Sequence, residues 1–142
     1  MLCVGVAVII EEGESRVELS EQDGIHIHSW KGAPTLGVVD RYYAALGAIV
    51  DRGQPFVLLT ETEGAGVPNA QVRKRIGEQQ IALEPRMRPL SPGSVVVVKS
   101  TLLRGALTAL SWIAPTLSEM VYAETLERGL ELAREIQRAS GR

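Results

Sequence analysis

The sequence predicts one α/β domain with a single mixed, mostly parallel β-sheet and about four helices packed on it. Two short apolar runs without helical period, "PFVLLTET" (55–62) and "SVVVVKS" (94–100), are typical of strands that are covered on both faces. They alternate with segments of helical period, and strands joined through helices pair in parallel by right-handed crossovers. A length of 142 residues fits one domain with one core.

The chain starts with an apolar stretch, "MLCVGVAVIIEEG", which predicts a β-strand with three valines on one face, Val4, Val6 and Val8. A signal peptide requires a basic start, and no Lys or Arg precedes Arg16. The stretch is also too short to span a bilayer. We therefore expect residues 1–14 to form an added strand or arm before a domain of residues 15–142.

Two segments of alternating apolar and polar residues follow, "SRVELSEQDG" (15–24) and "GIHIHSWKG" (24–32). Asp23-Gly24 between them is typical of a hairpin turn, so these segments predict two antiparallel strands at one side of the sheet. The period then changes in "APTLGVVDRYYAALGAIVDRG" (33–53), which predicts a helix that ends at Gly53. Its buried stripe is expected to contain Val39, Tyr43, Leu46 and Val50.

Three more helices are predicted after the central strand. "AQVRKRIGEQQIALEP" (70–85) has only a narrow apolar stripe, Val72, Ile76 and Leu83, so most of that helix is expected to face solvent. The segment 86–93 is expected to be irregular. Residues 101–114 form the next helix, "LSEMVYA" (117–123) contains a short strand, and the last helix begins after it. That last helix is expected to turn four residues inward, Leu126, Leu130, Ala133 and Ile136.

Charge and cysteine content restrict the partners and the compartment. The formal net charge is −2 and the pI is about 5.7, so no overall positive field attracts nucleic acid or an anionic membrane. Cys3 is the only cysteine, which excludes an internal disulfide and a thiolate zinc cluster. We therefore predict a cytoplasmic protein without a membrane span, a nucleic-acid partner or a cofactor.

The helix "STLLRGALTALSWIAP" (100–115) separates its polar and apolar residues cleanly. Thr101 or Ser100 is placed to cap its start and Pro115 to end it, while its leucines, alanines and isoleucine occupy the opposite side. One interpretation is a packing helix with a small polar outer face. The other is a strip that binds a partner, since Arg and Trp are enriched at interface hot spots, or, at Thr101 and Arg104, the edge of a ligand crevice. The candidate surface consists of Thr101, Arg104, Thr108, Ser111 and Trp112.

His26 and His28 are two residues apart on a predicted strand and therefore share a face, which Trp30 continues. Paired histidines are candidate metal ligands, but the nearby sequence offers no third ligand. Since Ile25 and Ile27 are expected to take the core face, the simpler interpretation is that both histidines face solvent.

The turn "TETEGAGVPN" (60–69) follows the central strand, where open α/β folds place ligands. It matches neither a P-loop nor a dinucleotide fingerprint, and its glutamates would repel phosphate. Asn69 is predicted to cap the next helix. The candidate turn site consists of Glu61, Glu63, Gly64, Gly66 and Asn69.

Basic residues cluster on and after the second predicted helix, at Arg73, Lys74, Arg75, Arg86 and Arg88. No aromatic residues stand beside them to stack on bases, and the chain is acidic overall. We therefore interpret the cluster as a solvated helix face or a surface for an acidic partner rather than a nucleic-acid site.

Taken together, three segments resemble the STAS family, the anti-sigma-factor antagonist fold, in its divergent SpoIIAA-like branch of small bacterial proteins. They are "RGQPFVLLTE" (52–61), "STLLRGALTALSWIAP" (100–115) and "VYAETLERGLELARE" (121–135), and the element order matches from about residue 15 to the C-terminus. The resemblance implies a non-enzymatic interaction module. Members with a phospho-switch carry a Ser or Thr in an Asp-Ser-Ser-Gly-like turn; here that turn has no serine, and Thr60 and Thr62 come too early, so no phosphosite is assigned.

Three functions follow from these observations. The first is a regulatory or scaffolding module that binds another protein or a second copy of itself as a homodimer. The second is a module of STAS-like fold that binds a small apolar ligand or lipid. The third, a metal-dependent activity at His26 and His28, lacks a recognisable ligand set, so the protein is predicted not to be an enzyme.

Overall fold

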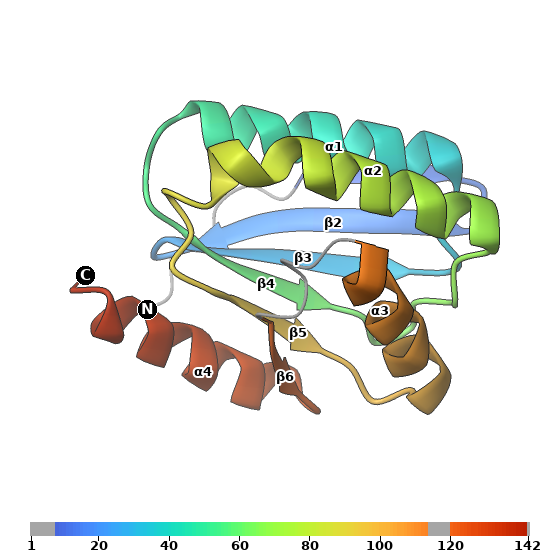
Figure 1. Cartoon of the computed structure of the whole chain (residues 1–142). Helices are drawn as coiled ribbons and strands as arrows, with labels where there is room; N and C mark the ends of the chain where they lie inside the picture. The colour runs from blue at the N-terminus through green and yellow to red at the C-terminus, as the bar shows by residue number, and fades with distance from the viewer. Residues whose placement is uncertain (1–7, 114–119, 142) are drawn as a thin grey trace.

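The computed structural model describes residues 8–113 and 120–141, with backbone only at 109–113, and contains one six-stranded sheet (Figure 1). Its strands follow each other in space as they do in sequence: β1 (Val8–Glu12), β2 (Ser15–Gln22), β3 (Ile25–Lys31), β4 (Val57–Glu61), β5 (Ser94–Val97) and β6 (Val121–Ala123). The helices are α1 (Leu36–Asp51), α2 (Ala70–Met87), α3 (Thr101–Ile113) and α4 (Leu126–Ala139).

The sheet is mixed and mostly parallel, as the sequence predicts. β1, β2 and β3 pair antiparallel, and β3, β4, β5 and β6 pair in parallel. Each parallel pair is joined through a helix, because parallel strands need a long crossover connection. The antiparallel strands lie at one side of the sheet, which confirms the predicted position of the hairpin.

Helices cover both faces of the sheet. α1 and α2 lie side by side over one face, and α4 lies on the opposite face (Figure 1). Side chains of β4 alternate between the two: Leu58 packs into the core under α1 and α2, and Leu59 packs into the core under α4. The three central strands are therefore buried on both sides, which confirms the interpretation of 55–62 and 94–100 as covered strands.

β1 is the edge strand beside β2. Of its apolar residues, Ile10 is buried, whereas Val8 and Ile9 are exposed. The Nη2 atom of Arg41 on α1 donates a hydrogen bond of 2.8 Å to the carbonyl oxygen of Glu11. The described part of 1–14 thus belongs to the same sheet as the rest, and the division of the chain at residue 14 stays a prediction.

Polar side chains cap the helices at their N-termini. Asn69 Oδ1 accepts from the Val72 amide at 2.9 Å, which confirms its predicted role at α2. Ser100 Oγ accepts from the Leu103 amide at 3.1 Å and caps α3. The predicted end of α2 at Pro85 is wrong, because the helix continues to Met87, whose side chain is buried in the core and holds the last turn in place.

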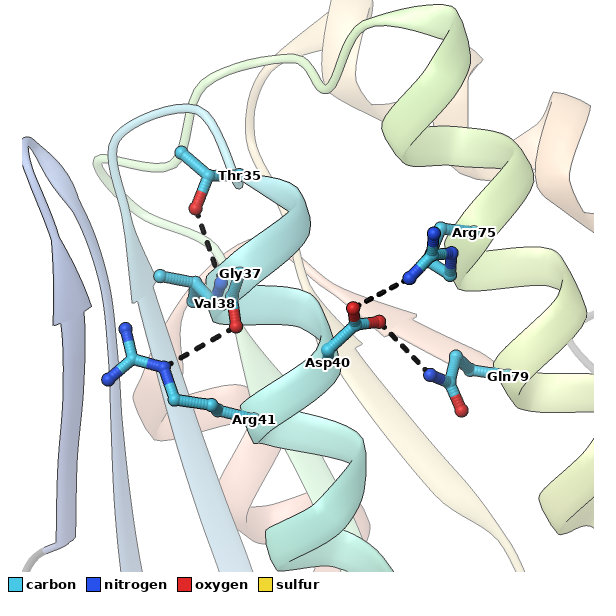
Figure 2. A network of polar contacts seen from close by, with 7 residues as sticks. All are labelled: Thr35, Gly37, Val38, Asp40, Arg41, Arg75 and Gln79. Carbon is cyan, nitrogen blue, oxygen red and sulfur yellow. Dashed lines mark hydrogen bonds and ion pairs between the residues drawn. The ribbon is translucent and has the colours of Figure 1, made fainter.

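Ion pairs join α1 to α2. Asp40 accepts from Arg75 Nη1 at 2.6 Å and from Gln79 Nε2 at 3.1 Å (Figure 2). The hydrogen bond from Arg75 is the main reason that the pKa of Asp40 lies below its usual value. About three helical turns further along both helices, Arg86 pairs with Asp51. Part of the basic cluster on α2 is therefore exposed but already paired with α1.

Leu126, predicted to face inward, is exposed, and so is Leu102 on the apolar side of α3. Leu126 is 40% exposed and Leu102 is 78% exposed. Both stand in the first turn of their helices. In α4, Gly129 and Ala133 are buried against the sheet instead. Within the described residues, no helix has the length and apolar composition needed to cross a membrane.

Candidate functional site

A cavity of about 190 Å³ lies between the sheet and helices α1, α2 and α3. Two cross-strand pairs of β4 and β5 form its floor, Leu58 with Ser94 and Thr60 with Val96. Alternation along β4 places Leu58 and Thr60 on this face, because successive strand residues point to opposite sides. Each of the two pairs therefore supplies one apolar side chain and one hydroxyl to the base of the cavity.

The three helices supply walls that are mostly apolar. α1 contributes two tyrosines and Leu46, and α3 contributes Leu103, Ala106 and Leu107. The wall from α2 consists of Ile76, Gln80 and Met87, with Glu84 and Arg88 near the end of that helix. Ligand sites are typically concave, mainly apolar and equipped with a few polar groups, and this cavity has that character.

Polar groups at the cavity are already partly paired. Tyr43 Oη donates to Gln80 Oε1 at 3.0 Å, and Arg88 Nε donates to Glu84 Oε1 at 3.0 Å. Burial raises the pKa of Tyr43, so its hydroxyl stays protonated as a donor. The Glu84–Arg88 pair is the only pair of charged side chains among the described lining residues.

Tyr42 connects the cavity to a buried histidine. Its hydroxyl lies 2.7 Å from His28 Nδ1, and the two rings meet edge to face at 5.3 Å between centroids. His28 is fully buried, and burial lowers its pKa to about 3, with His26 adding to the shift. His28 is therefore neutral at physiological pH.

The prediction that both histidines face solvent is wrong. His26 is 6% exposed and its ring contacts Phe56 edge to face. Burial is also the main cause that lowers the pKa of His26, while Glu21, 3.5 Å from its Nε2 atom, raises it. Because Tyr42 of α1 packs on this face of β3, both histidines are buried like Ile25. No cluster of three or more His, Cys, Asp or Glu side chains suited to a metal ion occurs in the described parts of the chain.

The candidate strip on α3 is exposed where its side chains are described. Thr101, Arg104 and Thr108 face outward, and the Thr108 hydroxyl donates to the Arg104 carbonyl at 3.0 Å. The guanidinium of Arg104 lies over the Tyr122 ring of β6, 4.8 Å from its centroid. Ser111 and Trp112 belong to the α3 backbone, but their side chains, like Pro115, lie outside the described residues.

The turn after β4 is hydrogen-bonded through its backbone to the loop after β3. Gly32 and Ala65 form an isolated parallel bridge, in which the Gly32 amide donates to the Gly64 carbonyl at 2.9 Å. Gly64 has a φ of +87°, and a Cβ on Gly66 would lie 2.9 Å from the Ala33 nitrogen, so both positions favour glycine. The backbone conformation at Gly64 and the close contact at Gly66 therefore explain why glycine occurs at both positions. Gly66 also lines the cavity.

The acidic residues of this turn lie apart. Glu61 is buried on the α4 side of β4, and burial raises its pKa, opposed by Lys31. Glu63 is exposed. Thr62 is buried and donates to the Val97 carbonyl at 2.6 Å, and both Thr60 and Thr62 line the cavity. The candidate turn site is thus divided between two faces of the sheet.

Comparison with known proteins identifies the fold. No protein-family model matches the chain, and no curated protein matches it. A solved protein from Shewanella loihica PV-4, of the DUF3478 family with a SpoIIAA-like fold, is similar with a TM-score of 0.50 and 12% identity over 94% of this chain and 95% of that one. The chain has a SpoIIAA-like fold. An anti-sigma factor antagonist from Mycobacterium paratuberculosis is also similar, with a TM-score of 0.48 and 18% identity over 93% and 95%.

The SpoIIAA-like fold confirms the resemblance inferred from the sequence, at the level of the fold. The sequence did not reveal the residues that line the cavity, above all Tyr42, Thr60 and Gln80. Gln80 carried a readable signal, because it is four residues after Ile76 on the same helical stripe. A polar residue in a buried phase predicts either an internal partner or a ligand.

Proposed function

We propose that this protein is a binding module that holds a small, mainly apolar molecule in the cavity between the sheet and helices α1, α2 and α3. The cavity itself carries the proposal. Protein interiors pack densely and contain few voids larger than a water molecule. An enclosed apolar cavity of about 150 Å³ is large enough to bind benzene; this one is partly open to solvent and measures about 190 Å³.

The cavity wall on α3 offers a way to test this proposal. Ala106 is half-buried and lines the cavity, so the variant Ala106→Phe is expected to place a phenyl ring inside it. Leu102, in the same helix, is 78% exposed, so Leu102→Phe adds bulk on the outside. Titration with isopropylbenzene, followed by backbone amide NMR shifts, measures binding to each variant.

We expect saturable binding to the wild type and to Leu102→Phe, and an affinity at least about tenfold lower for Ala106→Phe, a difference of about 1.4 kcal/mol. Thermal unfolding provides a second readout, since a ligand that binds only the folded state raises its stability. An absence of saturable binding to the wild type, or unchanged binding to a folded Ala106→Phe, would contradict the proposal.

A second candidate function is regulation through a protein partner that binds the outer strip of α3. The observation in its favour is that one face of α3 lines the cavity and the opposite face is exposed. Leu103 is buried at the cavity, while Arg104 is exposed and stacked on Tyr122 of the edge strand β6. Arginine is enriched at interface hot spots. The partner is another protein or a second copy of this chain, and the same helix would connect ligand and partner.

For this second function we expect Arg104→Glu to abolish capture of the partner in a pull-down from native lysate, and Trp112→Ala to weaken it. The matched control is Arg134→Glu, an exposed arginine of α4 on the opposite side of the sheet, which should leave capture unchanged. Light scattering of the purified chain separates self-association from binding of another protein. Equal capture by the wild type and Arg104→Glu would argue against this surface.

A further inference from the structure

The buried carboxamide of Gln80 indicates what kind of molecule the cavity accepts. Gln80 lies on α2 and is 7% exposed. Its Oε1 atom accepts a hydrogen bond of 3.0 Å from the Tyr43 hydroxyl. In this arrangement the amide oxygen faces Tyr43, and the amide nitrogen is turned away from it.

The Nε2 atom of Gln80 carries two donors that the described residues leave unused. No hydrogen bond to this nitrogen occurs among them, although the side chain is nearly buried and lines the cavity. This nitrogen is not among the fully buried polar atoms that lack a partner, so water or a ligand in the cavity can accept its hydrogen bonds. Thr60 on the cavity floor offers a second hydroxyl donor that no described residue accepts.

The charges around the cavity argue against an anionic ligand. Among the described lining residues, Glu84 and Arg88 are the charged ones, and they pair with each other at 3.0 Å. A carboxylate inside the cavity would therefore meet no uncompensated cation, and burial of an unpaired charge is strongly unfavourable. Donors without net positive charge suit an uncharged acceptor such as a carbonyl oxygen.

We infer that the cavity selects an uncharged, mainly apolar molecule with a carbonyl group (a ketone, ester or amide), and that Gln80 Nε2 donates to its oxygen. This inference rests on the proposed ligand-binding function. It adds a specificity-determining residue, because Gln80 would discriminate among apolar molecules of equal size.

Three probes of matched size and shape test the inference: acetophenone, isopropylbenzene and benzoate. The informative quantity is the ratio of the dissociation constants of isopropylbenzene and acetophenone, compared between the wild type and Gln80→Met. The methionine preserves the length of the side chain and removes both donors. Differences in probe hydration cancel in this comparison. We expect the ratio to fall about tenfold in Gln80→Met, and benzoate to bind the wild type at least about a hundredfold more weakly than acetophenone.

Two further variants separate a direct contact from a general effect on the fold. Gln79→Leu alters the half-buried neighbour that bonds Asp40 and does not line the cavity, and it should leave the ratio at the wild-type value. Tyr43→Phe removes the group that orients the Gln80 amide, and should lower the ratio in part. This variant also tests the inference should Gln80→Met fail to fold.

The outcomes distinguish the inference from the proposed function. Saturable binding of isopropylbenzene with an unchanged ratio in Gln80→Met, or in Tyr43→Phe where only that variant folds, overturns the carbonyl selection and leaves the binding module in place. Binding of benzoate as tight as acetophenone also overturns it. If no probe binds the wild type, both fail together.

Discussion

Replacement of Gly129 by valine is expected to lower the free energy of unfolding by about 3 kcal/mol. α4 packs tightly against the sheet at this glycine. A Cβ at Gly129 would lie 2.6 Å from Val97 Cγ2 and 3.4 Å from Leu59 Cδ1. Val97 and Leu59 are buried in β5 and β4, so neither can move aside without disturbing the core. Urea unfolding at neutral pH measures the loss.

Gly105→Val is the matched control for this substitution. Gly105 is an exposed helical glycine with no heavy atom within 4 Å of its ideal Cβ position. There the change removes the flexibility of glycine from a helix and should alter stability by less than about 0.5 kcal/mol. If both variants lose the same stability, the close packing of α4 against β5 is not what makes Gly129 necessary.

Acidification from pH 7.5 to pH 5 is expected to lower the free energy of unfolding by about 2 kcal/mol through His28 alone. The imidazole has a pKa of about 3 in the folded protein, against 6.5 for the unperturbed group. Between these values the unfolded chain binds a proton that the folded chain does not bind. Stability therefore begins to fall as the pH drops through 6.5, and this loss continues down to about pH 3.

The matched variant is His28→Leu, which removes the titrating group. It leaves the Tyr42 hydroxyl without its partner and should be less stable than the wild type at pH 7.5. The decisive measurement is the slope of stability against pH, which should be shallower by about one proton between pH 6 and pH 4. His26 and Glu21 remain in the variant and contribute the same background. Identical slopes would show that His28 titrates normally in the folded protein.

The sequence predicted the sheet well because periodicity records which residues share a face. It failed at His26 and His28, since alternation does not reveal whether a helix covers the second face. Tyr42, which pairs with His28, lies on the next helix, and the sequence of the strand does not predict this contact. Leu102 and Leu126 are exposed for a related reason, because a helical wheel contains no information on which turns of a helix other elements cover.

The cavity could be anticipated only in part. Gln80 breaks the apolar stripe of α2 at a buried position, which is visible in the sequence. The volume itself depends on the separation of α1, α2 and α3 from β4 and β5, and that separation is a property of packing rather than of any segment. The strip on α3 was predictable as a polar edge, but its contact with Tyr122 required the two elements to be placed in space. The predictions of a cytoplasmic location, of no nucleic-acid partner and of no enzymatic activity stay predictions.

Arg41 helps to protect the free edge of the sheet, at β1, from pairing with strands of other molecules. An edge strand presents free carbonyl and amide groups that can template pairing with another chain, the first step toward aggregation. β1 is such an edge and exposes Val8 and Ile9, which would favour such pairing. The guanidinium of Arg41 occupies the Glu11 carbonyl, so an incoming strand must displace it before it can pair there. We therefore expect this side chain on the covering helix to reduce strand-to-strand association of the protein in concentrated solution.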